Sequence, residues 1–309
     1  MGRIHSVTAR AVIIAAIAIL PGCGGGVTIP TTDSGRQASE SATFRRDARL
    51  PILVDKSPST AGVFLGEVCG AGSVVSCANF ADTFRHGIAL GTVYTDWSVD
   101  FTKLIKNQGL DAWVQAGVTP EVTWQPTSNV TFTDINRGAY DVLFATSAIE
   151  LKTWGQTIFL RPFHEFNGNW YPWGLTNQGA SSATDRAFVA AWQRMVTIFR
   201  AHGASNVKFV WCFSTGGLNN DQKYPWNNPA KAYPGDGYVD WLGFDTYNRG
   251  NLAMGQRWRT FDDITQTPYQ LATAISNARP IAVSEIASTE YGDGGKLKSS
   301  WIRQMLLEL

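Results

Sequence analysis

Two glutamates follow short apolar runs that have the length of buried β-strands. Glu165 lies in the aromatic-rich segment 161–173, directly after the run at 157–161, and Glu285 ends the run that begins at Ile281. Burying an unpaired carboxylate is costly, so charged residues seldom end buried strands without a function. Both carboxyl groups are therefore candidates for proton transfer or nucleophilic attack. A simpler interpretation of Glu165 is a surface salt bridge with Arg161, with the aromatic residues covering the loop.

Strand-like and helix-like segments alternate from about residue 61 onward, which favours a parallel α/β architecture over a sandwich. The clearest helices are predicted at Tyr140–Trp154 and Thr184–His202, where apolar residues recur at helical spacing and Gly155 and Gly203 follow as stops. Seven strands are predicted, at Gly62–Val68, Gly91–Trp97, Pro120–Trp124, Thr157–Arg161, Val207–Cys212, Trp241–Thr246 and Ile281–Glu285.

These elements predict an α/β fold of the (β/α)8 TIM-barrel type, in which active sites lie at the C-terminal ends of the strands. Glu165 and Glu285 can therefore face each other across the barrel although they are far apart in sequence. Retaining glycosidases hold two such carboxyl groups about 5–5.5 Å apart, one to protonate the leaving oxygen and one to attack the anomeric carbon.

The eighth strand of the predicted barrel is missing. After Glu285 only one helix-like stretch, Lys296–Leu309, remains, and the segment before Ala61 is too polar for a strand buried on both faces. The barrel is therefore expected to be truncated before its eighth strand, with catalytic domain 61–309 incomplete at its C-terminal end.

The chain resembles glycoside hydrolase family 26, a clan A family typified by endo-β-1,4-mannanases, from about Gly62 to Leu309. The motifs that show the resemblance are Arg161–Trp170 (RPFHEFNGNW), similar to the acid/base segment of the family, and Val283–Glu285, similar to its nucleophile strand. Residues 233–247 are similar to its sixth-strand segment.

The resemblance implies that Glu165 is the acid/base, Glu285 the nucleophile, His164 a neighbour that contacts sugar or nucleophile, and Trp170 an aromatic wall of the sugar site. Tyr247 is expected to hydrogen-bond Glu285 and keep it ionised, a role that a phenol can fill on physical grounds alone. The alternative is that Tyr247 is a core tyrosine.

Four further residues are candidates for the same barrel face. Trp97, Trp124 and Trp173 are candidate sugar platforms, because aromatic rings offer flat amphipathic surfaces, and equally candidates for packing at the rim. Asn167 is either a substrate contact or a turn residue beside Gly168.

The composition favours a neutral partner. Lysine plus arginine (26) nearly balance aspartate plus glutamate (25), so nothing indicates a nucleic-acid footprint. A neutral β-glycan is the expected partner, and the protein is expected to be a monomer. Neither a cofactor nor a metal is expected, because the chain has only four histidines and no CxxC pair to supply zinc ligands.

The N-terminus has the layout of an export signal. Residues 1–22 combine Arg3 and Arg10 with an apolar run from Ala11 to Leu20, and the junction at Cys23 resembles a bacterial lipobox, although Pro21 departs from it. We expect a signal peptide at 1–22, a lipidated Cys23 and a polar tether at 23–60, which makes the lipid anchor the only membrane attachment; plain secretion is the alternative.

Export implies an oxidising compartment, so Cys69 and Cys77, which lie in a Gly/Ser-rich stretch, are candidates for a local disulfide, with reduced thiols as the alternative. Cys212 is expected to be an inert core residue.

Two classes of function are left open by the sequence. The first is an endo-acting β-mannanase without cofactor, or an enzyme of the same family that cleaves mixed-linkage β-1,3-1,4-glucan or β-1,3-xylan. The second is a non-catalytic, glycan-binding surface lipoprotein, a hypothesis that the incomplete barrel favours and the presence of both carboxylates opposes.

Lipidation at Cys23 is testable by substitution. Cys23→Ala should release the protein from membranes, because the lipidated cysteine is the only expected anchor. Fractionation of the expressing bacteria measures this. A wild-type mature protein found in the periplasm or medium with a free N-terminal amine would indicate plain secretion instead.

Overall fold

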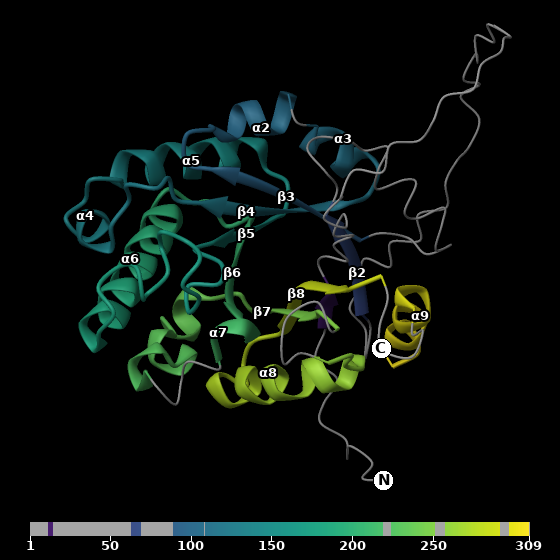
Figure 1. Cartoon of the computed structure of the whole chain (residues 1–309). Helices are drawn as coiled ribbons and strands as arrows, with labels where there is room; N and C mark the ends of the chain where they lie inside the picture. Colours follow the sequence, from purple (N-terminus) through teal and green to yellow (C-terminus); the bar gives the residue numbers. More distant parts are fainter. Residues whose placement is uncertain are drawn as a thin grey trace, which may run out of the picture.

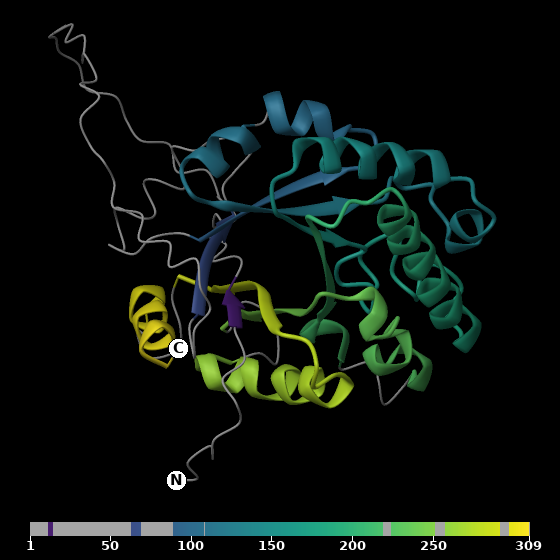
Figure 2. The same cartoon turned by 180° about the vertical axis from the view of Figure 1, so that it is seen from behind.

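The computed structural model describes residues 12–14, 63–68, 89–107, 109–218, 224–250, 257–290 and 297–308. Within these ranges eight parallel strands follow one another around a closed barrel, with helices on its outside (Figures 1 and 2). The strands are β1 (Val12–Ile14), β2 (Val63–Val68), β3 (Leu90–Asp96), β4 (Thr119–Gln125), β5 (Ile158–Pro162), β6 (Val207–Ser214), β7 (Trp241–Asn248) and β8 (Ile281–Ser288).

The predicted fold class is confirmed. Each of the seven strands expected from the sequence is present, with ends that differ by three residues or fewer. Each pairs in parallel with its neighbours, and the β7–β8 ladder has a register shift between Phe244 and Asp245. Since all strands run the same way, the loops that follow β5 and β8 lie at one end of the barrel.

The eighth barrel position is filled from an unexpected part of the chain. After β8 the described residues contain helix α9 and no further strand, as expected, but β1 pairs with β8 on one side and β2 on the other. Its three β-branched residues suit a strand, and the pairing satisfies backbone groups on two edges. The expectation that no other segment substitutes for the missing strand is therefore corrected.

The segment that supplies β1 is also the predicted signal peptide. Cleavage before Cys23 removes β1, so one molecule cannot use the segment in both ways. The described residues do not include Cys23, the tether at 23–60, Cys69 or Cys77. The predictions for them stay predictions.

Helices cover the barrel between the strands. They are α2 (Phe101–Asn107), α3 (Leu110–Gln115), α4 (Phe132–Asn136), α5 (Asp141–Trp154), α6 (Ser182–Ala201), α7 (Thr215–Leu218), α8 (Phe261–Ile275) and α9 (Lys298–Glu308), with 3-10 turns η1 (Pro225–Asn227), η2 (Pro229–Ala232) and η3 (Asp236–Tyr238). Gly155, which directly follows α5, has a φ of 74°, the left-handed conformation that glycine adopts without strain.

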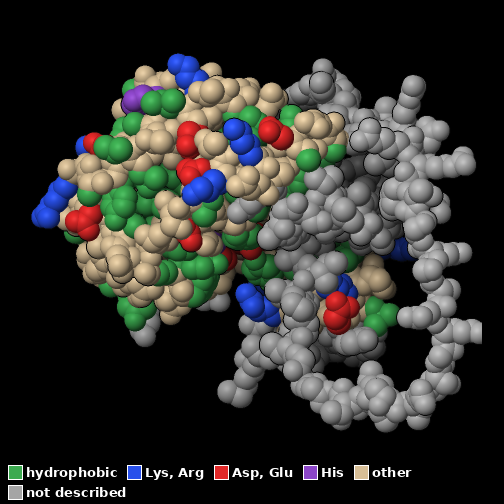
Figure 3. All heavy atoms as spheres, turned by 90° about the horizontal axis from the view of Figure 1, so that it is seen from above, with side chains coloured by type: hydrophobic (Ala, Val, Ile, Leu, Met, Phe, Trp, Pro, Cys, Tyr) green, Lys and Arg blue, Asp and Glu red, His purple; other side chains and the backbone are tan. Residues whose placement is uncertain are grey.

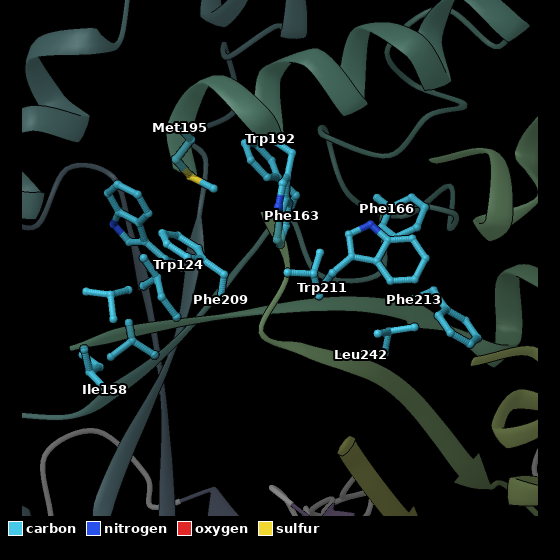
Figure 4. Packing of buried hydrophobic residues seen from close by; sticks show 14 of the residues in the cluster. Trp124, Ile158, Phe163, Phe166, Trp192, Met195, Phe209, Trp211, Phe213 and Leu242 are labelled. Atoms are coloured by element: carbon cyan, nitrogen blue, oxygen red, sulfur yellow. The ribbon is translucent and has the colours of Figure 1, made fainter. Parts of the chain in front are cut away.

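The core lies between the strands and the helix layer. The apolar face predicted for α6 is buried, and Trp192 and Met195 pack over Trp211, Phe209 and other residues of the barrel (Figure 4). Each such side chain contributes on the order of 1.5–3 kcal/mol by leaving water. This packing fixes β5 and β6, the strands beside the loop of Glu165.

Basic and acidic side chains are interspersed on the face seen in Figure 3.

In the described part of the chain, none of the helices has the length and apolar character needed to cross a membrane.

Candidate active site

The loop after β5 makes an unusual turn at Glu165. Phe163 and Glu165 have φ values of 51° and 53°, in the left-handed region that non-glycine residues rarely adopt. Each costs on the order of 1–2 kcal/mol. The backbone N–H of Glu165 donates to Cys212 O of β6 at 3.1 Å, which helps to hold the turn in place. Such strain is typical of functional sites.

Trp170 contacts Glu165 directly. Its indole Nε1 donates to Glu165 Oε2 at 2.6 Å, while 46% of the residue remains exposed. The ring lies so close to the backbone of Gly168 that a Cβ there would be 2.5 Å from the indole, and at Gly216 it would be 3.3 Å away. Glycine at these positions therefore leaves room for the Trp170 indole beside the acidic group.

Asn167 fastens this loop to β6. Its side-chain Nδ2 donates to Ser214 O at 2.9 Å, and its Oδ1 accepts from Ser214 N at 2.8 Å. Its backbone carbonyl accepts from Asn227 Nδ2 at 2.7 Å. Trp173 closes the other end of the loop by donating to His164 O at 2.8 Å. The position of Glu165 is thus fixed from both sides.

Glu285 receives hydrogen bonds on both carboxylate oxygens. Oε1 accepts from Arg161 Nη2 at 2.8 Å and from the Tyr94 hydroxyl, and Oε2 accepts from the Tyr247 hydroxyl. Burial by itself would raise the pKa of Glu285, but the Arg161 charge and the phenol hydrogen bonds lower it below the usual glutamate range. Glu285 is therefore ionised at neutral pH.

Glu165 has the opposite electrostatic environment. Burial raises its pKa, and the negative charge of Glu285 raises it further, while hydrogen bonds from Ser214 and Trp170 and the charge of Arg161 only partly offset this. Two carboxyl groups at one end of the barrel thus differ in their tendency to hold a proton. Such a pair can divide acid and nucleophile roles.

His164 is a neutral residue in this site. Burial, followed by the nearby Arg161 charge, lowers its pKa to about 3. The ring lies edge-on to Tyr94 and Tyr171, with centroid distances of 5.9 and 4.6 Å. Neither ring nitrogen has a hydrogen-bond partner among the described residues.

The sequence matches one known enzyme family over the part that contains this site. The profile of glycosyl hydrolase family 26 matches residues 124–289, more than half of the chain, including Glu165 and Glu285. The chain belongs to glycosyl hydrolase family 26. The resemblance expected from the two motifs is confirmed.

The chain is also similar to individual polysaccharide hydrolases. Endoglucanase H of Acetivibrio thermocellus is 36% identical over 214 residues, which are 68% of this chain and 22% of the relative. Mannan endo-1,4-beta-mannosidase A and B of Caldalkalibacillus mannanilyticus is 30% identical over 50% of this chain and 26% of its own length. The match thus spans about a quarter of these relatives.

A solved structure shows the same fold. That of the YdhT protein from Bacillus subtilis superimposes with a TM-score of 0.54 at 18% identity, covering 76% of this chain and 72% of that one.

The family 26 site contains some of the predicted residues and excludes others. Tyr247 donates to Glu285 as expected, and Trp170, expected as an aromatic wall of the sugar site, donates to Glu165. The sugar-platform interpretation is wrong for Trp124, which is fully buried, and for Trp97, which packs in the core against Trp124, Phe144 and Phe163.

The other two candidates, Trp173 and Asn167, have structural roles: Trp173 packs at the rim, and Asn167 anchors the loop. Trp173 is 4% exposed and stacks on Tyr171 at a centroid distance of 4.4 Å. Asn167 is fully buried and its amide is occupied by Ser214, so it is a structural residue of the loop.

Arg161 has a different place in the site from the one considered in the sequence. It is fully buried and pairs with Glu285, Asp245 and Glu121, so the alternative interpretation, a surface salt bridge with Glu165, is wrong. Tyr94, Glu121 and Asp245 are site residues that the sequence motifs did not indicate. A signal was present, because Glu121 and Asp245 are charges inside predicted strands, where unpaired burial is costly.

Tyr247→Phe is expected to shift the acidic limb of the kcat/KM profile to higher pH. A hydrogen bond to a charged group is worth about 1.5–3 kcal/mol, so its loss should raise the pKa of Glu285 by about one unit or more. Activity that requires ionised Glu285 is lost as the pH falls through that pKa. Kinetics between about pH 3 and 8 measure the shift.

Tyr233→Phe is the matched control, because the Tyr233 hydroxyl donates to Asp236 and has no contact with either glutamate. Equal acidic limbs in the wild type and Tyr247→Phe would show that Tyr247 does not hold Glu285 ionised.

Proposed function

We propose that this chain is the catalytic domain of a retaining endo-β-glycosidase, with Glu165 as acid/base and Glu285 as nucleophile. The observation that supports this most is the opposite effect of the site on the two carboxyl groups: Arg161 and two phenols favour the anion at Glu285, while burial and Glu285 itself favour the proton on Glu165. Membership in a glycosidase family agrees with it.

The proposed reaction has two steps. In the first, a carboxylate oxygen of Glu285 bonds to the anomeric carbon as the glycosidic bond breaks, and the Glu165 proton passes to the leaving oxygen. In the second, the Glu165 carboxylate takes a proton from water, whose oxygen bonds to the anomeric carbon and displaces Glu285. Both carboxyl groups end in their starting states.

Two other residues are proposed to contact the sugar. Trp170 is half-exposed beside Glu165, and its indole offers a flat apolar surface to a pyranose ring on the leaving-group side. His164 is neutral, and its two ring nitrogens are buried without a hydrogen-bond partner among the residues described, so a sugar hydroxyl that reaches them would satisfy them.

We propose β-1,4-mannan as the substrate, since the relative from Caldalkalibacillus mannanilyticus is a mannan endo-1,4-beta-mannosidase. A β-glucan is the second candidate, because the relative that matches 68% of the chain at 36% identity is an endoglucanase. Reducing-sugar release from mannan, mixed-linkage β-glucan and β-1,3-xylan decides between them. The proposal predicts fastest release from mannan, and faster release from either other polymer would overturn it.

An exported location, with a lipid anchor at Cys23, is proposed for the whole protein; in the processed form β1 is removed and the strands β2 to β8 remain. A polymeric glycan cannot enter a cell intact, and the N-terminal sequence has the layout of a lipoprotein signal.

Substitution of the two glutamates should have different effects. Glu165→Gln should lower turnover of polysaccharide by roughly 10²–10⁴, the usual contribution of general acid catalysis, and by less on aryl glycosides whose leaving groups need little protonation. Glu285→Ala should abolish turnover of every substrate, with partial rescue by azide. Steady-state kinetics on both substrate types measure this difference.

Product stereochemistry is the independent check on the mechanism. NMR of the first product should show retained anomeric configuration. Initial inversion, or near-normal activity of Glu285→Ala, would contradict the assigned roles.

A further inference from the structure

One buried guanidinium contacts carboxyl groups from three different strands. Arg161 of β5 lies with Nε 3.1 Å from Glu121 Oε1 of β4, Nη1 3.1 Å from Asp245 Oδ1 of β7, and Nη2 2.8 Å from Glu285 Oε1 of β8. Every edge of the planar group therefore faces a carboxyl group. Only Glu285 has a role in the proposed reaction.

Glu121 is buried away from the reacting groups. It is 2% exposed, and its Oε2 accepts a hydrogen bond from Thr92 Oγ1 of β3 at 3.1 Å. Its contact with Arg161 is a close approach without good hydrogen-bond alignment, because Nε donates to Thr123 Oγ1 at 3.1 Å. The contacts that connect Glu121 to Glu285 therefore run through Arg161, while the two carboxyl groups act on each other directly only through charge repulsion.

The orientation of the guanidinium decides whether Glu285 is held. Nη2 donates to Glu285 at 2.8 Å and to Thr123 Oγ1 at 2.7 Å, so a tilt of the plane changes both contacts. Asp245 restrains the Nη1 corner. Thr123, which accepts the Nε hydrogen bond, and Glu121, which packs against Nε and is held by Thr92, together occupy the remaining edge.

We propose that Glu121 is a positioning residue for the nucleophile: it fills the Nε edge of Arg161 and so keeps Nη2 directed at Glu285 Oε1. This inference rests on the proposed function, because it assumes that ionised Glu285 attacks the sugar. It adds Thr92, Glu121 and Arg161 to the site as a chain of contacts that runs from β3 through β4 and β5 to the nucleophile on β8.

Charge and shape can be separated at this position. Burial raises the pKa of Glu121 to about 7, only partly offset by Arg161, so Glu121 is neutral at the lower pH where Glu285 titrates. Glutamine is then a close mimic of the neutral Glu121 side chain.

Several titratable and polar groups face Glu121 or Glu285 and bear on the pH profile. They are Thr92 and Tyr94 of β3, Arg161 of β5, His164 and Glu165 of the following loop, and Asp245 and Tyr247 of β7.

The test compares Glu121→Gln with Glu121→Ala in the full chain, using an aryl β-mannobioside or β-cellobioside that the wild type hydrolyses. Glu121→Gln should keep kcat within about threefold and leave the acidic limb of kcat/KM in place. Glu121→Ala opens the Nε edge, and should lower kcat at least tenfold with KM nearly unchanged, since small displacements of reacting groups cost about that much or more. Its acidic limb should move up by about one pH unit, as Arg161 loosens its hold on Glu285.

Glu150→Gln is the matched control, because Glu150 also accepts hydrogen bonds, from Phe101 N and Thr102 Oγ1, but on the outer helices. Its profile should equal that of the wild type. Acidic limbs that coincide in all variants would overturn the proposal, even if Glu121→Ala unfolds more readily, and so would a Glu121→Gln limb shifted up by a full unit. Failure of the proposed function itself is distinguishable, because it appears as a wild type that hydrolyses none of the glycosides.

Discussion

The site depends on the contacts that surround one buried charge, the guanidinium of Arg161. A guanidinium keeps its charge in the interior, so the protein must provide anionic or polar partners for each of its edges. Three carboxyl groups and Thr123 supply them from β4, β7 and β8. Because these strands are far apart in sequence, only the curved parallel sheet brings their side chains to one point.

One positive charge shared by several carboxyl groups also explains the unequal protonation of the site. Full ionisation of Glu121, Asp245 and Glu285 around Arg161 would leave an uncompensated negative charge in the interior. Burial raises the pKa of Glu121 and Asp245, whereas Glu285 keeps its charge through Arg161 and two phenols. The negative charge is thus concentrated on the carboxylate that lies at the open end of the barrel, and it raises the pKa of Glu165.

The strands and the two glutamates could be predicted from the sequence because apolar runs and charges at their ends are local signals. The orientation of side chains within each strand was harder to predict. Glu121 and Thr123 contact Arg161 inside the barrel, so Trp124, the next residue, points outward to the helices and packs in the core. A tryptophan at the end of a strand resembles a sugar platform until this alternation is known.

The partners of Arg161 and the origin of β1 could not be predicted for a different reason. Both depend on contacts between segments that are distant in sequence, and no local pattern states which buried carboxyl group meets which strand. The apolar run around Val12 suits a signal peptide and a strand equally well, since a signal peptide needs only an apolar run, and the β-branched residues within this one also favour a strand.

The most direct test of the central claim is a pH titration of the glutamate side chains by carbon NMR on ¹³C-labelled protein, with signals assigned from Glu165→Gln and Glu285→Gln. We expect Glu285 to titrate below the ordinary glutamate range and Glu165 above it. A Glu285 that still holds its proton at neutral pH, beside an ionised Glu165, would contradict the proposed division of roles.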